Sequence, residues 1–396
     1  MYKRQGYDYD VITAEALIER ASVRDGKIVL PDGINYRVLV LPERDQISLP
    51  VLKKISELVK AGATVIGPKP AHAETMENFA AADAEVRKIA DALWGGQTGK
   101  GHVITGKTAR EVLLADGIAP DCEFVNAGEW PLDYIHRTTA AAEIYFIANR
   151  ATNAVAVNCA FRVAGKAPEL WNAITGERKF APAYEEKAGR VFVPLDFGPC
   201  GSWFVVFREP ASTHPAVAKS NSVELKSLQE ISGAWTVHFD PKWGGPETAQ
   251  FNSLVSWPTR PEPGIKFYSG TAVYEKSFTV DDSKLKTNNS ILLLDLGNVR
   301  ELAEVKVNGK SCGTVWCPPW RVDVTDAIKS GENQIQIEVV NFWPNRLIGD
   351  ARLPVAQRLT HTNIRKLTAK TPLEPAGLFG PVTLLETIEP PASPKN

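Results

Sequence analysis

The 396-residue sequence lacks several features on which common functional assignments depend. Basic residues are not in excess, since the formal net charge is −1, so charge gives no reason to expect binding to nucleic acid. No apolar run approaches the length of a membrane span. Residues 1–6 include basic side chains but no apolar core follows them, so they do not predict a secretory signal. We therefore expect neither a nucleic-acid partner nor a membrane partner.

Cysteine and histidine are scarce and widely spaced. Five cysteines cannot all pair within one chain, and no Cys-x-x-Cys unit occurs. On one continuous strand Cys312 and Cys317 would point to opposite faces, which opposes a disulfide between them. We expect buried free thiols. The six histidines have no metal-ligand spacing such as His-x-x-x-His, so we expect no metal or cofactor in this chain.

The length predicts two or three domains, and the first of them, residues 1–115, is typical of an α/β fold. Apolar runs at 38–41, 64–66 and 102–104 predict buried strands. Between them lie two amphipathic stripes, one beginning near Pro50 and ending at Gly62, the other ending at Gly95. This alternation predicts a parallel sheet of the amidotransferase or flavodoxin-like kind. Residues 7–12 are predicted to form an opening strand.

Nucleotide and nucleophile motifs are absent from this α/β part. Residues 42–45 follow the first buried strand in place of a Gly-x-Gly-x-x-Gly loop, and no Walker loop occurs. The second buried strand ends at Gly67-Pro68-Lys69-Pro70, where an amidotransferase would have a cysteine nucleophile. Prolines on both sides of Lys69 also oppose a direct turn into a helix. We expect a domain that has the sheet without the chemistry.

The remainder of the sequence predicts β structure. Residues 116–212 contain short β-rich runs separated by glycine turns, which is typical of a small antiparallel sandwich. Residues 210–222 are rich in Ala, Ser and Pro and resemble a linker. Residues 223–390 predict a jelly roll, and in it Asn308-Gly309 fits a tight hairpin turn. Residues 391–396 are expected to be a disordered tail.

Aromatic residues in the C-terminal part are the strongest indication of a ligand class. Indole rings stack on the C–H faces of sugars, while Asn, Asp and Arg side chains bind hydroxyl groups. Several such residues occur in runs that look like loops, and one of them, Trp343-Pro344-Asn345-Arg346, is followed closely by Asp350. Core packing and a turn-forming role for the aspartate are the alternatives. The candidate carbohydrate-binding residues are Trp316, Trp320, Trp343, Asn345, Arg346 and Asp350.

Motifs along the chain resemble glycoside hydrolases. Ser269-Gly270-Thr271, Val307-Asn308-Gly309, Gly331-Glu332-Asn333 and Gly377-Leu378-Phe379-Gly380-Pro381 resemble the galactose-binding-like jelly roll of family 2-type enzymes. Residues 36–42 and 61–65 resemble an amidotransferase-like accessory domain of glycosidases, and residues 169–177 resemble the β-domain that follows it. With residues 343–350, the combination is most similar to the C-terminal part of α-L-rhamnosidases of glycoside hydrolase family 106.

This resemblance implies hydrolysis of terminal α-L-rhamnosyl bonds by the full-length enzyme, with a rhamnose-containing glycan as partner and an extracellular or periplasmic location. In the family, the acid and base glutamates and a calcium ion belong to a barrel N-terminal to the region matched here, so no catalytic residue is assigned. We expect a non-catalytic C-terminal portion whose partner is that barrel. A stand-alone carbohydrate-binding protein and a purely structural scaffold are the alternatives.

Overall fold

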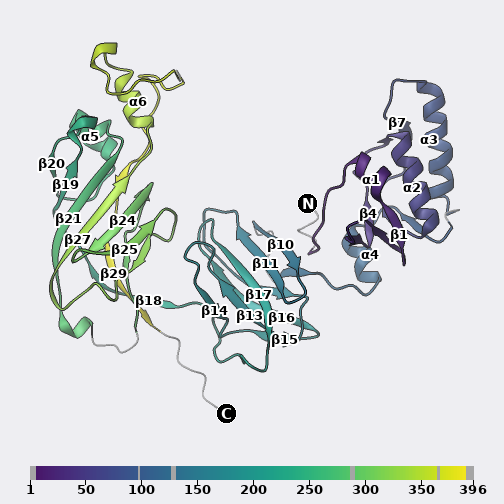
Figure 1. Ribbon diagram of the computed structural model, residues 1–396, viewed down its shortest axis with the longest axis horizontal. Helices are drawn as coiled ribbons and strands as arrows, with labels where there is room; N and C mark the ends of the chain where they lie inside the picture. Colours follow the sequence, from purple (N-terminus) through teal and green to yellow (C-terminus); the bar gives the residue numbers. More distant parts are fainter. Residues whose placement is uncertain (1–5, 97–98, 126–130, 286–289, 364–365, 389–396) are drawn as a thin grey trace.

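The computed structural model describes residues 6–96, 99–125, 131–285, 290–363 and 366–388. Figure 1 shows three bodies in a row, which follow one another in chain order. None of the helices in these ranges is both long enough and apolar enough to span a membrane. The tail expected at residues 391–396 lies outside the described residues.

The first body combines a small parallel sheet with helices. The sheet is formed by β4 (Val38–Val40), β6 (Thr64–Ile66) and β8 (His102–Ile104), and both pairings are parallel. The helices are α1 (Ala14–Arg20), α2 (Leu49–Ala61), α3 (Phe79–Trp94) and α4 (Ala109–Ala115). The remaining strands are β1 (Ser22–Arg24), β2 (Lys27–Val29) and β3 (Asn35–Tyr36), which are antiparallel, and β5 (Gln46–Ile47) with β7 (His72–Ala73), which are parallel.

The sequence signals for this body are confirmed locally. Helix α2 has Pro50 in its first turn and ends before Gly62, whose φ of +122° favours glycine. Its apolar stripe is buried against the sheet and α3. The strand expected at residues 7–12 is wrong. This segment is held instead by the connection to the next body, through Tyr7 Oη donating to the Ile118 carbonyl at 2.6 Å. The amidotransferase-like character of the sheet stays a prediction.

The second body is a sandwich of two antiparallel sheets with a shared core. One sheet has β10 (Leu132–Thr138), β11 (Glu143–Asn149), β17 (Ser202–Pro210), β13 (Lys166–Trp171) and β14 (Arg178–Phe180). The other has β15 (Glu185–Lys187), β16 (Arg190–Phe197), β12 (Val155–Phe161) and β9 (Cys122–Val125). Residues 211–223 contain no helix or strand, but they are not a free linker, since Asn221 Nδ2 donates to the Pro194 carbonyl at 2.8 Å.

The third body is a larger sandwich. Its six-stranded sheet runs β20 (Thr248–Phe251), β19 (Trp235–Phe239), β21 (Thr271–Val280), β27 (Gly331–Val340), β24 (Leu302–Val307) and β25 (Lys310–Val315). Its four-stranded sheet runs β18 (Glu224–Glu230), β29 (Thr383–Ile388), β22 (Leu292–Asp295) and β26 (Arg321–Asp323). A short pair, β23 (Val299–Arg300) with β28 (Gly377–Leu378), and helices α5 (Pro263–Lys266) and α6 (Pro344–Asp350) complete it.

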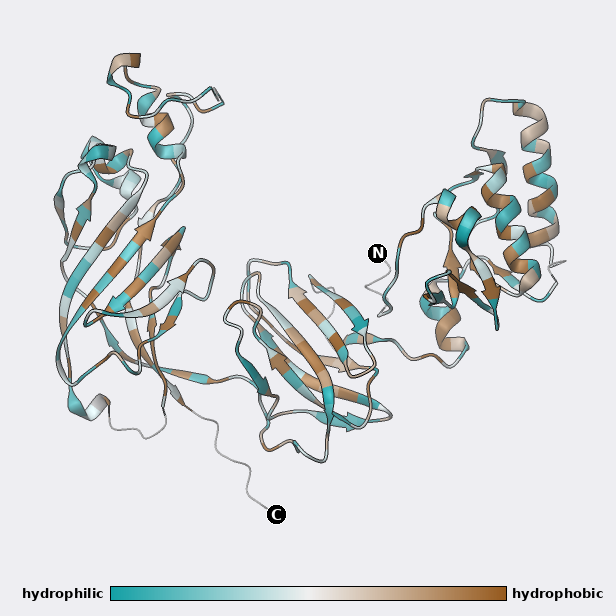
Figure 2. Cartoon of the chain, in the orientation of Figure 1, coloured by the Kyte–Doolittle hydropathy of each residue, from teal (hydrophilic) through white to brown (hydrophobic). Residues whose placement is uncertain are grey.

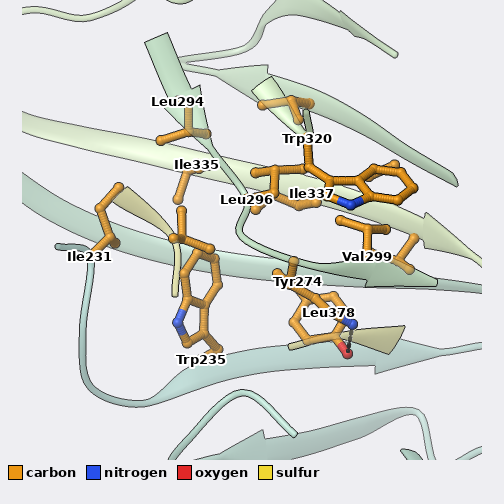
Figure 3. Close-up of a cluster of buried hydrophobic side chains, with 14 of the residues drawn as sticks. Ile231, Trp235, Tyr274, Leu294, Leu296, Val299, Trp320, Ile335, Ile337 and Leu378 are labelled. Atoms are coloured by element: carbon orange, nitrogen blue, oxygen red, sulfur yellow. Dashed lines mark hydrogen bonds between the residues drawn. The ribbon is translucent and has the colours of Figure 1, made fainter. Parts of the chain in front are cut away.

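Side chains of alternating polarity build the core of the third body. Figure 2 shows hydrophobic and hydrophilic residues alternating along its strands, as expected for a sheet with one buried face. Trp235 is buried and lies in the same cluster as Tyr274 and Leu378 (Figure 3). The phenol oxygen of Tyr274 accepts a hydrogen bond from Trp257 Nε1 at 2.6 Å, so the polar atoms of both buried rings have a hydrogen-bond partner in the core.

One end of the third body is closed by a tight hairpin. Asn308 and Gly309 join β24 to β25 with φ values of +51° and +80°, which confirms the predicted turn. The Asn308 side chain accepts from Gln334 N at 3.0 Å and donates to the Ala327 carbonyl at 2.8 Å. These contacts fix the hairpin to β27, and we refer to this as the closed end.

Candidate functional site

Strand register brings the aromatic segments of the third body to one end. Val340, the last residue of β27, pairs with Thr271 at the start of β21 and with Leu302 at the start of β24. Val315, the last residue of β25, pairs with Ala303. The segments 240–246, 296–301, 316–320 and 341–350 therefore leave the sheets at the same end, opposite the closed end. We call these four segments the loop end; α6 marks it in Figure 1.

Exposed aromatic rings lie on the loop end. Trp316 is 58% exposed, Phe342 61% and Trp343 48%. The ring of Trp243 packs edge-to-face on Trp343, with centroids 4.9 Å apart, which holds the Trp343 indole in place while leaving much of it in contact with water. Rings presented in this way are suited to stacking on a sugar face.

Trp320 has a different position from the exposed rings. It is only 7% exposed and lies beside Leu296, Val299 and Ile337 in the core (Figure 3). Its carbonyl accepts a hydrogen bond from Leu296 N at 2.8 Å, which ties the end of the 316–320 segment to the end of β22. The indole thus forms part of the core and also contributes to the wall of a cavity.

The cavity at the loop end has a volume of about 280 Å³. Its lining residues are Asp295, Gly297, Asn298, Arg300, Pro318, Pro319, Trp320 and Arg321. The Asp295 carboxylate accepts from Arg321 Nε at 2.7 Å, so these two charges compensate each other. Among the described residues, Asp295 is the only acidic one in the lining, which leaves this cavity without the second carboxylate that glycoside hydrolysis requires.

Two polar side chains of the cavity lining have no partner in the described part of the chain. The structure gives neither the Arg300 guanidinium nor the Asn298 amide a side-chain hydrogen bond or ion pair there. Arg300 is half-buried and Asn298 is exposed. Sequence reasoning missed both residues, as well as Asp295 and Arg321. The available signal was weak: Asp295 belongs to the Leu294-Asp295-Leu296-Gly297 run, and Arg321 directly follows Trp320.

The polar residues predicted after Trp343 point inward. The expectation of a loop is wrong here, because residues 344–350 form α6, with Pro344 in its first turn. Arg346 and Asp350 are 6% and 3% exposed, and Arg346 Nη2 lies 3.1 Å from Asp350 Oδ1. Asp350 Oδ2 also accepts from Thr360 N and Oγ1, at 2.8 and 2.6 Å.

Asn345 is also used internally. Its Nδ2 donates to the Glu374 carbonyl at 2.7 Å, and its Oδ1 accepts from Glu374 N at 2.9 Å. Together with the Asp350–Thr360 contacts, this binds α6 to the segment that follows it. Of the six candidate residues, Trp316 and Trp343 reach solvent, Trp320 lines the cavity, and Asn345, Arg346 and Asp350 hold the loop end together.

A separate cluster of charges lies where the first body meets the second. His136 on β10 sits between two carboxylates, with Nδ1 3.0 Å from Asp121 Oδ2 and Nε2 2.9 Å from Glu143 Oε2. Its ring stacks on Tyr145 at a centroid distance of 3.9 Å. Burial lowers the pKa of His136, but the two carboxylates more than offset it, so the net pKa is raised. The two carboxylates therefore favour the protonated form of His136 in the folded junction.

Among the described ranges, no group of three or more His, Cys, Asp or Glu side chains is placed to hold a metal ion. The five cysteines are free thiols, but the expectation that they are buried is right only for Cys122 and Cys159, since Cys200 is exposed and Cys312 and Cys317 are half-buried. Burial raises the pKa of the Cys122 and Cys159 thiols, so they behave as core residues rather than as nucleophiles.

Comparisons with known proteins connect this architecture to glycosidases. Residues 3–186 match the model of the alpha-L-rhamnosidase family, and residues 265–371 match the model of the glycosyl hydrolase 2 galactose-binding domain-like family. The second match covers much of the larger sandwich, including most of the loop end.

Two relatives extend the comparison to nearly the whole chain. The solved structure of a rhamnosidase from Novosphingobium sp. PP1Y is 35% identical with a TM-score of 0.80, and the match covers 96% of this chain and 36% of that one. A protein from Formosa agariphila named "Putative beta-glucuronidase" is 25% identical, over 89% of this chain and 49% of that protein. The chain thus spans half or less of the length of these relatives.

Proposed function

We propose, from the confirmed resemblance of this chain to α-L-rhamnosidases of glycoside hydrolase family 106, that it forms a non-catalytic C-terminal portion of such an enzyme. Joined to a catalytic barrel, the whole would hydrolyse terminal α-L-rhamnosyl bonds. The observation that supports this most is the shared fold with a rhamnosidase, because the match takes up nearly all of this chain and little more than a third of that enzyme.

The chemistry of the described residues agrees with a supporting role. Glycoside hydrolysis needs two carboxyl groups roughly 5 to 10 Å apart across the scissile bond. The cavity at the loop end offers one carboxylate, Asp295, and that group is already paired with Arg321. A carboxylate already engaged by an arginine is not free to take either of the two roles that glycoside hydrolysis requires.

The domain organisation follows from the same proposal. We assign residues 1–115 to an amidotransferase-like α/β accessory domain, 116–212 to a β-sandwich and 223–390 to the galactose-binding-like jelly roll. Separate hydrophobic cores support this division: one lies around α2 and β6, one between the sheets of the second body and one in the third. The parallel pairing of β4, β6 and β8 supports the α/β assignment of the first domain.

Carbohydrate contact is assigned to the loop end of the jelly roll. Trp316 and Trp343 would stack on sugar rings, because their indoles are the exposed ones among the candidate residues. Asn345, Arg346 and Asp350 would act indirectly, by fixing α6. The substrate glycan would contain rhamnose, and an extracellular or periplasmic location would suit an enzyme of this class. The exposed rings also favour a second candidate, a carbohydrate-binding protein that acts without a barrel.

The test is turnover of an aryl α-L-rhamnoside by the purified chain, with the Novosphingobium rhamnosidase as positive control. The expected result is no release of the aryl group above the uncatalysed rate, because the described lining of the cavity offers no suitable pair of acids. Turnover that persists through successive purification steps would refute the non-catalytic assignment. Titration with methyl α-L-rhamnoside, followed by tryptophan fluorescence, tests the binding role: an unchanged spectrum would remove it.

A further inference from the structure

We propose that the cavity at the loop end binds one sugar unit that carries an anionic substituent, and that Arg300 recognises the anionic group. The proposal rests on the proposed function for its carbohydrate context. The remaining argument comes from the charge, the partners and the size of the cavity.

The balance of charge in the lining favours an anion. Asp295 and Arg321 neutralise each other through their 2.7 Å contact. Arg300 then remains as an uncompensated cation, since no other acidic residue of the described ranges lines the cavity. A guanidinium is planar and presents paired N–H donors, which match the oxygens of a carboxylate or of a sulfate ester. An anionic group would supply the charge that the lining lacks.

Arg300 is not used for folding in the way that other arginines of this body are. Arg321 pairs with Asp295, and Arg346 pairs with Asp350 inside α6. Arg300 lies on the two-residue strand β23, and only its backbone is engaged there, opposite Gly377. A half-buried guanidinium without a partner in the described residues is available to a ligand at no cost in internal contacts.

The rest of the lining fits a sugar ring rather than a free anion. Trp320, Pro318 and Pro319 provide an apolar wall, and the Asn298 amide can both donate to and accept from hydroxyl groups. A volume of about 280 Å³ lies near the lower limit of small-molecule sites, which suits one monosaccharide unit. Trp316, two residues before Pro318, is exposed beside this wall and could contact a second unit of the glycan.

The experiment uses the full chain and ligand-observed saturation-transfer NMR, with affinities measured by calorimetry. The probes are methyl β-D-glucuronide, glucose 6-sulfate, methyl α-L-rhamnoside and sodium acetate. We expect one or both anionic sugars to bind, with an affinity that falls as sodium chloride is raised. The variant Arg300→Gln should weaken that binding about 10- to 100-fold, as expected for loss of a charge-assisted contact. Arg300→Lys, which retains the charge without the planar fork, should have an intermediate affinity.

The matched control is Arg24→Gln, which removes the same charge from an exposed position on β1, far from the jelly roll. It should leave the affinity unchanged. Binding of glucuronide alone assigns a carboxylate, and binding of the sulfate ester alone assigns a sulfated sugar. Equal binding of acetate and glucuronide would show an unspecific anion site and overturn the proposal. So would anionic-sugar binding that Arg300→Gln leaves intact, or no binding of either anionic sugar. None of these results bears on turnover, so the proposed function is tested separately.

Discussion

Replacing Asp350 with alanine should destabilise the third body strongly, because it leaves a buried cation without its counter-ion. The side chains of Arg346 and Asp350 are 7% and 4% exposed, and they are 3.1 Å apart. Breaking a buried pair by removing one partner costs about 3 to 5 kcal/mol, most of it from the charge left behind. Asp350→Ala also removes two hydrogen bonds from Thr360, so we expect the upper part of this range.

The double variant Arg346→Met/Asp350→Ala separates the two contributions. Without a buried charge, the remaining loss is that of the Thr360 contacts, about 1 to 2 kcal/mol. The double variant should therefore be more stable than Asp350→Ala alone. The measurement is urea unfolding followed by tryptophan fluorescence, since six tryptophans lie in this part of the sequence. If the double variant unfolds at the same urea concentration as the single one, or at a lower one, the account of Arg346 as a paired internal charge is wrong.

The remaining predictions concern the junction and the two sides of the loop end. His136→Asn should reduce the free energy of unfolding mainly at low pH. Because the pKa of His136 is raised in the folded state, its stabilising contribution is present below about pH 6.5 and is lost as the pH rises through the folded-state pKa. The urea midpoints of the two proteins should therefore differ more at about pH 5.5 than at about pH 9. A difference that grows with pH would contradict this. Trp343→Ala should weaken rhamnoside binding about 2- to 12-fold with little effect on thermal stability. The control Phe79→Ala, which removes an exposed aromatic ring from α3, should change neither the affinity nor the thermal stability. If calorimetry gives Trp343→Ala the same affinity as the original protein, Trp343 is not part of the binding surface. Gly297→Ala should lower the free energy of unfolding by about 2 kcal/mol or more, because the residue has φ +69° and the new methyl group would overlap the Gly380 carbonyl. An unchanged melting temperature would refute the close approach of Gly297 to Gly380.

Local patterns in the sequence were sufficient for most elements. The alternation of Ile335, Ile337 and Val339 with polar residues predicts β27, and the stripe that ends at Gly62 predicts α2. These signals are short-range, since a period of 2 or 3.6 residues reports directly on which face is buried. The tight turn at Asn308 is also a short-range signal, because the positive φ values that it requires are adopted by two adjacent residues, Asn308 and Gly309.

The direction of polar side chains at the loop end could not be predicted in this way. Arg346 and Asp350 form an ion pair, Asp350 also accepts from Thr360, and Asn345 is hydrogen-bonded to Glu374. The Thr360 and Glu374 contacts depend on the course of the chain after α6. The run beginning Trp343-Pro344 looked like a loop because the helix it starts is only seven residues long.

The cavity escaped prediction for a related reason. Its lining comes from the end of β22, from β23 and from the segment before β26, and register alone brings them together. The sequence alone does not distinguish Arg300 from other arginines, since what sets it apart is that it lacks the ion pair that Arg321 has in the described part of the chain. Such a difference is visible only once the partners of each side chain are known.

The two ends of the jelly roll differ in a way that is useful for experiments. At the closed end, Asn308 joins the hairpin to its neighbours through its own amide, and Gly309 has open space around it, with nothing within 4 Å of an added methyl. A fluorescent label or an affinity handle introduced at Lys310, the exposed first residue of β25, would be attached to a well-anchored turn on the side remote from the loop end. Immobilising the protein there would leave every candidate contact free for glycan-array or single-molecule measurements.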